Sequence, residues 1–147
     1  EKTQQKGKLK SLLQNVTQFD VTRLSNKKIS LFLKIIRSSK QTKSILGFSS
    51  ALENIGKYLD ETNESVSNFK VKSIIANSEY LNSYTKSTLK KHFNAPVFSR
   101  YSSEEIGIIA QQTLKSPNQF IINHASYHIE ILNFDNDESA SEGEFGR

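Results

Sequence analysis

The sequence predicts an α/β fold: a parallel β-sheet with flanking helices, of the three-layer type, followed by a smaller strand-rich segment. Two observations predict it. Strand-like apolar runs alternate with helix-like runs over residues 25–105, which is typical of βαβ units. Each strand-like run also ends in small or polar residues, as strands do where the chain leaves a sheet. The whole of residues 1–147 is therefore expected to be a partial domain, with residues 1–24 as a polar, basic lead-in.

The first helix is predicted over residues 26–38. Its apolar residues recur at helical spacing and form one stripe, and Ser25 precedes them as a plausible N-cap. The stripe consists of Ile29, Phe32, Leu33 and Ile36.

A short buried strand is expected next, over residues 44–48. Ser50 and Glu53 then have the spacing of a capping box, which predicts a helix from Ser50 to about Leu59. A polar loop is expected over residues 60–68.

The same pattern then repeats. Residues 71–76 are rich in β-branched side chains and predict a strand, residues 81–93 predict a helix, and residues 97–101 predict the next strand.

Residues 106–147 do not continue this strand–helix alternation. Residues 106–110 suit a strand or a short helix, and residues 119–123 and 127–132 each predict a strand.

Because the predicted strands are parallel, the carboxyl ends of three of them should meet at one edge of this sheet. Ligands of open parallel sheets bind outside these carboxyl ends. Those ends carry residues 47–49, residues 77–79 and the run Tyr101–Gly107. The last run places an aromatic ring, two hydroxyls and two carboxylates directly behind a strand. It suits a nucleotide crevice, although composition alone also allows a polar turn.

Composition excludes several classes of protein. The chain has 147 residues, a net charge of +5 and no cysteine, which rules out a disulfide framework and a thiolate metal site. No apolar run approaches the roughly 18 residues of a membrane helix, and no signal peptide is visible. We therefore expect no membrane insertion and a cytoplasmic location. The basic residues are spread along the chain, so we expect no nucleic-acid partner.

The strand-end sequences resemble those of the adenylate-forming ligases, and most closely the phenylacetate–coenzyme A ligase branch with its capsular-polysaccharide-biosynthesis relatives. Tyr101–Gly107 is similar to the Tyr-Ser-Asn-x-Glu-x-Gly variant of the family signature. Residues 74–79 resemble the family's Gly-Ala-Glu segment. Residues 127–132 and 142–147 resemble the family's Glu-Ile and Gly-Glu-x-Gly run, which precedes its next strand. The resemblance covers residues 45–147.

The resemblance implies a fragment of an enzyme that uses ATP and Mg²⁺ to activate a small carboxylate as an acyl-adenylate, with coenzyme A as a possible acceptor. Tyr101 would stack on adenine, and Glu105 would be the catalytic residue that contacts magnesium. The implied nucleotide-binding residues are Asn77, Ser78, Glu79, Tyr101, Ser102, Ser103 and Glu104, and the substrate-pocket candidates are Phe48, Ser49 and His124.

Other roles stay open for three of these residues. Tyr101 could be a core tyrosine, Glu105 a carboxylate at a helix start, and Glu79 an acid in the first turn of a helix. The chain also departs from the family: Ser102 replaces the commoner Gly, and Glu104 stands where a Thr or Ser usually touches the α-phosphate.

The family's phosphate loop, its ribose-binding Asp segment and its catalytic Lys domain have no counterpart in this sequence. We therefore expect the isolated chain to be inactive. The alternative is a non-catalytic α/β module that binds a nucleotide or an acidic partner. A basic nucleic-acid-binding domain is a weaker third reading, and a homodimer is left open.

Overall fold

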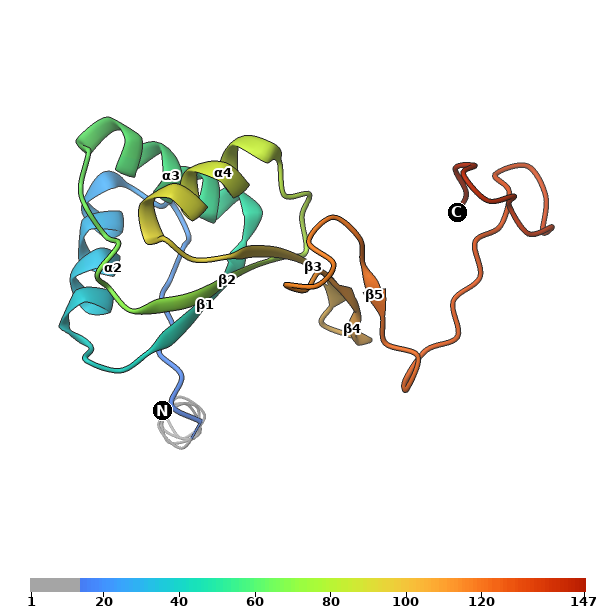
Figure 1. Ribbon diagram of the computed structural model, residues 1–147, viewed down its shortest axis with the longest axis horizontal. Helices are drawn as coiled ribbons and strands as arrows, with labels where there is room; N and C mark the ends of the chain where they lie inside the picture. The colour runs from blue at the N-terminus through green and yellow to red at the C-terminus, as the bar shows by residue number, and fades with distance from the viewer. Residues whose placement is uncertain (1–13) are drawn as a thin grey trace.

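The computed structural model describes residues 14–147, and the first half of the predicted lead-in, residues 1–13, lies outside them. The fold is mixed α/β, as predicted (Figure 1). Its elements are α2 (Asn26–Ser38), β1 (Lys43–Phe48), α3 (Ser49–Thr62), β2 (Val71–Asn77), α4 (Ser83–Phe93), β3 (Val97–Ser103), β4 (Gly107–Gln111) and β5 (Ile121–Ile122).

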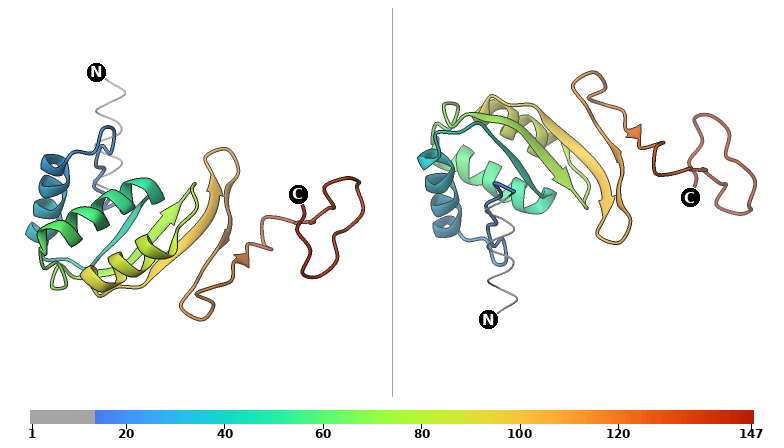
Figure 2. Two further views of the ribbon diagram at one scale, coloured as in Figure 1. Left: turned by 90° about the horizontal axis from the view of Figure 1, so that it is seen from above. Right: turned by 90° about the horizontal axis from the view of Figure 1, so that it is seen from below.

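The strands form one five-stranded sheet in the order β1-β2-β3-β4-β5. The first three strands are parallel, joined by crossovers through α3 and α4, whereas β4 and β5 pair antiparallel. Figure 2 shows the β3–β4 hairpin extending beyond the helices, with the C-terminal residues further out. The predicted βαβ repeat is confirmed.

One face of the sheet carries the core. Ile45, Ile74 and Val97 are paired across β1, β2 and β3, and all three are buried. They belong to a single cluster with buried residues of α2, α3 and α4, so the three helices cover the same face. Leu46 lies on the opposite face and is 57% exposed.

The helix ends follow the sequence in part. Ser25 caps α2 as predicted, accepting a hydrogen bond from the Lys28 amide at 3.4 Å. The capping box predicted for α3 is wrong: the helix starts at Ser49, its N-cap Phe48 supplies no side-chain bond, and the Glu53 carboxylate binds other partners. The predicted polar loop also starts too early, because α3 continues to Thr62.

The strand-rich segment is smaller than predicted. Residues 107–111 form a strand, which settles one of the two readings of this stretch, but β5 has only two residues. The strand predicted over 127–132 is wrong, and only an isolated bridge joins Leu132 to Ser139. Ile129 and Ile131 remain exposed, so burial does not favour an extended pairing there. No helix within residues 14–147 is long and apolar enough to cross a membrane.

Asp60, near the end of α3, ties that helix to α4. Its carboxylate lies 2.8 Å from His92 Nε2 and accepts a hydrogen bond from the Tyr84 hydroxyl at 2.9 Å. Lys91 and Thr88 lie within 3.5 Å of the same carboxylate. The His92 contact above all, and then the Tyr84 hydroxyl, lower the pKa of Asp60 from 3.8 to about 2.

Truncating the core row should destabilise the fold far more than truncating the opposite face. Ile74 is fully buried, so Ile74→Ala should cost about 2–5 kcal/mol of unfolding free energy. Leu46→Ala, one strand away on the exposed face, should cost roughly 0.5 kcal/mol. Urea unfolding of both variants measures this, and equal losses would contradict the placement of the core.

Replacing Asp60 by Asn should make stability less sensitive to acid. A carboxyl whose pKa is lowered on folding stabilises the protein above its unfolded pKa and loses that contribution as the pH falls. The stability advantage of the wild type over D60N should therefore be complete above pH 3.8 and shrink toward pH 2. Denaturation at several pH values checks this, with Glu61→Gln as an exposed control. An advantage that did not change with pH would contradict it.

Candidate functional site

The carboxyl ends of the three parallel strands meet at one edge of the sheet. Phe48 of β1 pairs with Asn77 of β2, and Asn77 pairs with Arg100 of β3, so these residues form one row. Arg100, which sequence reasoning missed, donates from Nε to Gln111 Oε1 at 2.6 Å, and desolvation lowers its pKa. Its only sequence signal is its position directly before Tyr101. The predicted convergence of strand ends is therefore present.

The run Tyr101–Gly107 is a β-hairpin that extends beyond this row. β3 continues to Ser103, roughly 10 Å past Arg100 at the rise of a strand, and pairs with β4 through a turn at residues 104–106. Gly107 ends the turn with φ +78°, a left-handed conformation that favours glycine. A register shift between Tyr101 and Ser102 marks a bulge, a common device next to functional sites.

The Tyr101 ring is accessible. The residue is 63% exposed, so the reading of Tyr101 as a core tyrosine is wrong. Because successive side chains of a strand point to opposite faces, Tyr101 and Arg100 project from opposite sides of β3. The ring is thus available for stacking at the edge of the sheet.

The two carboxylates of the motif lie in the hairpin turn. Glu105 is therefore not at a helix start, which removes that reading. A hydrogen bond from its own amide, and then one from the Ser103 hydroxyl, lower the pKa of Glu105, so it is ionised at neutral pH. The Ser103 hydroxyl also accepts from the Ile106 amide at 3.3 Å. Glu104 is exposed in the same turn.

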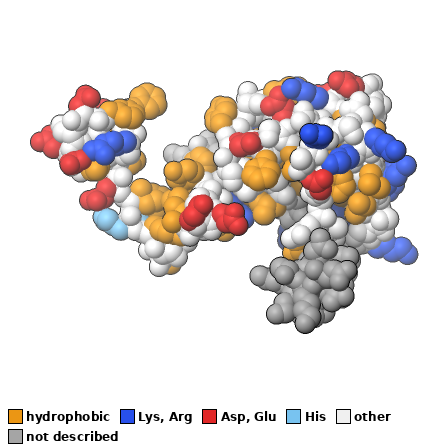
Figure 3. All heavy atoms as spheres, turned by 180° about the vertical axis from the view of Figure 1, so that it is seen from behind, with side chains coloured by type: hydrophobic (Ala, Val, Ile, Leu, Met, Phe, Trp, Pro, Cys, Tyr) orange, Lys and Arg blue, Asp and Glu red, His pale blue; other side chains and the backbone are white. Residues whose placement is uncertain are grey.

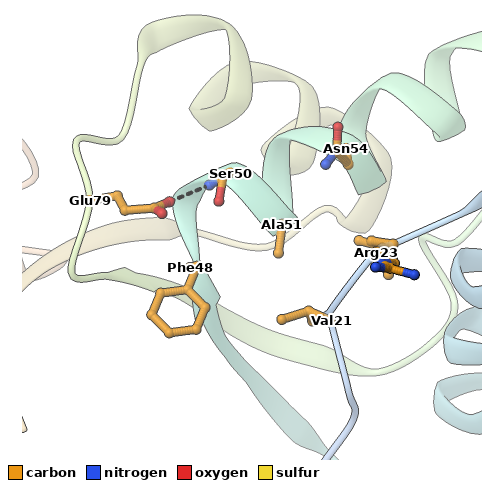
Figure 4. Close-up of a pocket in the computed structure, with 8 residues that line it drawn as sticks. Val21, Arg23, Phe48, Ser50, Ala51, Asn54 and Glu79 are labelled. Carbon is orange, nitrogen blue, oxygen red and sulfur yellow. Dashed lines mark hydrogen bonds between the residues drawn. The ribbon is translucent and has the colours of Figure 1, made fainter.

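A second rim segment, residues 77–79, follows β2 and is tied to the start of α3. The Glu79 carboxylate accepts a hydrogen bond from the Ser50 amide at 2.7 Å (Figure 4). The buried Ser49 hydroxyl donates to the Glu79 carbonyl at 3.0 Å. Glu79 thus acts at the first turn of α3, whereas the alternative reading expected a first-turn acid in the helix that follows it. Ser78 has φ +64°, and its hydroxyl accepts from Asn77 Nδ2 at 3.3 Å.

A pocket of about 390 Å³ lies beside the carboxyl end of β1 (Figure 4). Phe48 and Glu79 line it, together with residues that sequence reasoning missed. These are Val21, Arg23, Leu24, Ser50, Ala51 and Asn54. Residues 21–24 belong to the predicted lead-in, and no sequence motif distinguishes them.

The structure does not bring all the predicted substrate-pocket residues together. Phe48 lines the pocket beside β1, while the Ser49 hydroxyl is already engaged by Glu79. His124 follows β5 at the other edge of the sheet. Four strand spacings separate β1 from β5, on the order of 19 Å. Within residues 14–147, Phe48 and His124 therefore do not share a pocket.

Charge on the described surface is mixed. Figure 3 shows Lys and Arg side chains scattered among acidic and apolar ones over the face that it presents. No group of three or more His, Asp or Glu side chains with metal-binding geometry is present in residues 14–147. Magnesium, however, is commonly held by one or two carboxylates and the phosphates of a substrate. The single Glu105 carboxylate fits magnesium that enters with ATP, and does not fit a preformed cage.

Comparison with known proteins shows which solved structures share this fold. No protein-family profile and no curated protein matches the chain. Among solved structures, 2-hydroxyisobutyryl-CoA ligase with 2-HIB-AMP and CoA superimposes with a TM-score of 0.71 at 15% identity, over 87% of this chain. Benzoate CoA ligase from Burkholderia xenovorans LB400 gives 0.66 at 15% identity over 85%. The anthranilate CoA ligase AuaEII with anthranoyl-AMP gives 0.65 at 14% over 83%.

The match covers only part of each ligase. This chain spans 30% of the length of the first structure, 25% of the second and 23% of the third. At these identities the likeness concerns the fold alone. The chain therefore has the fold of one portion of these acyl- and aryl-CoA ligases.

Proposed function

We propose that this chain is the central part of the large domain of an ATP-dependent adenylate-forming ligase, which activates a carboxylate as an acyl-adenylate and releases pyrophosphate. One observation carries the proposal: 87% of the chain superimposes on a CoA ligase. The hairpin Tyr101–Gly107, at the edge where a parallel sheet binds ligands, supports it. The phenylacetate–coenzyme A branch, a role in polysaccharide biosynthesis, coenzyme A as acceptor, a cytoplasmic location and a homodimer stay predictions.

The nucleotide would bind at the edge formed by the hairpin and residues 77–79. The exposed Tyr101 ring offers a rigid apolar face for adenine. Asn77 and Ser78 offer backbone groups one strand away, whereas the Asn77 side chain, in register with Arg100, lies on the face opposite Tyr101. The Ser103 hydroxyl already donates to the Glu105 carboxylate, so the Ser102 hydroxyl is the better candidate to donate to the phosphate, a contact that the family makes with Thr or Ser.

Glu105 would act on the phosphate side. Its carboxylate is ionised at neutral pH and stands at the tip of the hairpin, where it can bind magnesium carried by ATP. Magnesium would supply neutralisation of phosphate charge. The residues of this chain would bind and orient the nucleotide, which is the main requirement for transfer at phosphorus. We expect the isolated chain to bind ATP weakly without catalysing the reaction.

One observation favours the non-catalytic alternative. Glu104 places a second carboxylate in the turn beside the proposed phosphate position, where it would repel the α-phosphate unless directed away from it. That repulsion would oppose holding the α-phosphate in position for attack, whereas in a module that only binds, it would lower the affinity without preventing the function. The two functions differ in whether the full-length parent releases pyrophosphate.

Removing the Tyr101 ring should weaken nucleotide binding. Loss of one aromatic–base stack costs about 1–3 kcal/mol, so Tyr101→Ala should raise the Kd for ATP roughly tenfold, while Tyr101→Phe should leave it nearly unchanged. NMR titration of the chain with ATP measures both. Tyr80→Ala is the control, because Tyr80 is 86% exposed in the neighbouring segment. Equal effects of Y101A and Y80A would refute the stacking role.

Removing the Glu105 carboxylate should make the affinity for ATP independent of magnesium. In the chain, Glu105→Ala should abolish the increase in ATP affinity that Mg²⁺ produces and leave magnesium-free binding intact. In the full-length parent it should abolish magnesium-dependent pyrophosphate release. Glu104→Ala is the matched control from the same turn, and it should retain the magnesium effect. Unchanged pyrophosphate release by the full-length E105A variant would contradict the assignment of Glu105 as the magnesium-binding residue.

A further inference from the structure

The segment between β2 and α4 is tied to α3 at two points. At its beginning, Glu79 accepts two hydrogen bonds from the first residues of α3: its carboxylate accepts from the Ser50 amide, and its carbonyl accepts from the Ser49 hydroxyl. At its end, Asn82 Nδ2 donates to the Glu53 carboxylate at 2.9 Å. Only the first contact is adjacent to the proposed nucleotide edge.

Ser78, directly before Glu79, adopts an unfavourable backbone conformation. Its φ of +64° is left-handed, and non-glycine residues hold such a conformation only when their surroundings fix it. The two hydrogen bonds that Glu79 accepts provide that fixation from the next residue along the chain. Asn77, on the other side of Ser78, is held by its pairing with Arg100, the residue immediately before Tyr101.

We propose that Glu79 is a positioning residue, whose bond to the start of α3 sets residues 77–78 at the distance from Tyr101 that a nucleotide requires. The inference rests on the proposed function and deepens it. Glu79 acts through the backbone of residues 77–78 and does not touch the reacting atoms. Its carboxylate replaces the side-chain cap that Phe48 cannot supply, and the helix dipole favours an anion at this position.

Three substitutions separate positioning from simple stabilisation. Glu79→Ala removes the bond to Ser50, whereas Glu79→Gln keeps an acceptor oxygen and loses only the charge. Glu53→Gln weakens the second tie of the same segment, away from the nucleotide edge. Glu61→Ala, exposed on α3, serves as the surface control.

The test measures the chain by NMR, first without nucleotide and then during titration with ATP. Without nucleotide, E79A should shift the amide signals of Ser50 and residues 77–79, E79Q should shift them less, and E61A should leave them unchanged. Losing a hydrogen bond to a charged group should then raise the Kd for ATP about tenfold in E79A. E79Q should restore most of the affinity, and E53Q should lower thermal stability while changing the Kd less than about twofold.

Two results would overturn the inference. If E79A and E53Q weakened ATP binding equally at equal loss of thermal stability, Glu79 would be merely structural. If E79A left the signals of residues 77–79 in place, it would not position them. Failure of the wild type to bind ATP would overturn the proposed function and the nucleotide role of Glu79 together. The shifts recorded without nucleotide distinguish that failure from the other two.

Discussion

The parallel pairing of β1, β2 and β3 is the constraint on which the arrangement depends. Burial of Ile45, Ile74 and Val97 against the helices fixes the register, because a slip of one residue would turn each of them to the opposite face. The same register brings three carboxyl ends to one edge. Position at that edge, more than the chemistry of any single side chain, makes Tyr101–Gly107 part of a candidate site.

The hairpin adds a second constraint at this edge. β3 extends beyond the end of its parallel neighbour β2, and there it pairs antiparallel with β4. Residues Tyr101–Gly107 therefore project from the sheet as an ordered hairpin turn. Gly107 permits the left-handed turn, and the bonds of the Ser103 hydroxyl order the residues beside Glu105. The polar-turn reading and the nucleotide reading of this run are thus compatible, because the turn holds the aromatic ring and the carboxylate in place.

The elements that the sequence predicts best are those whose periodicity burial enforces. α2 appears with its predicted bounds and with Ser25 as its cap, and the three parallel strands fall within two residues of expectation. The predictions fail where residues distant in the sequence determine the local structure. Local spacing suggested that Ser50 and Glu53 cap α3, but Glu79, 29 residues further along, takes that role. The pocket beside β1 and the lost strand at 127–132 likewise depend on contacts that leave no local pattern.

The central claim is that one edge of this sheet holds a nucleotide between the hairpin and the segment fixed by Glu79. A crystal structure of the chain, or of its full-length parent, with ATP and Mg²⁺ tests that claim most directly. The account predicts adenine stacked on the Tyr101 ring, with the phosphates directed toward Ser102 and Glu105. Adenine in the pocket beside Val21 and Arg23, or a nucleotide bound away from the carboxyl edge, would contradict it.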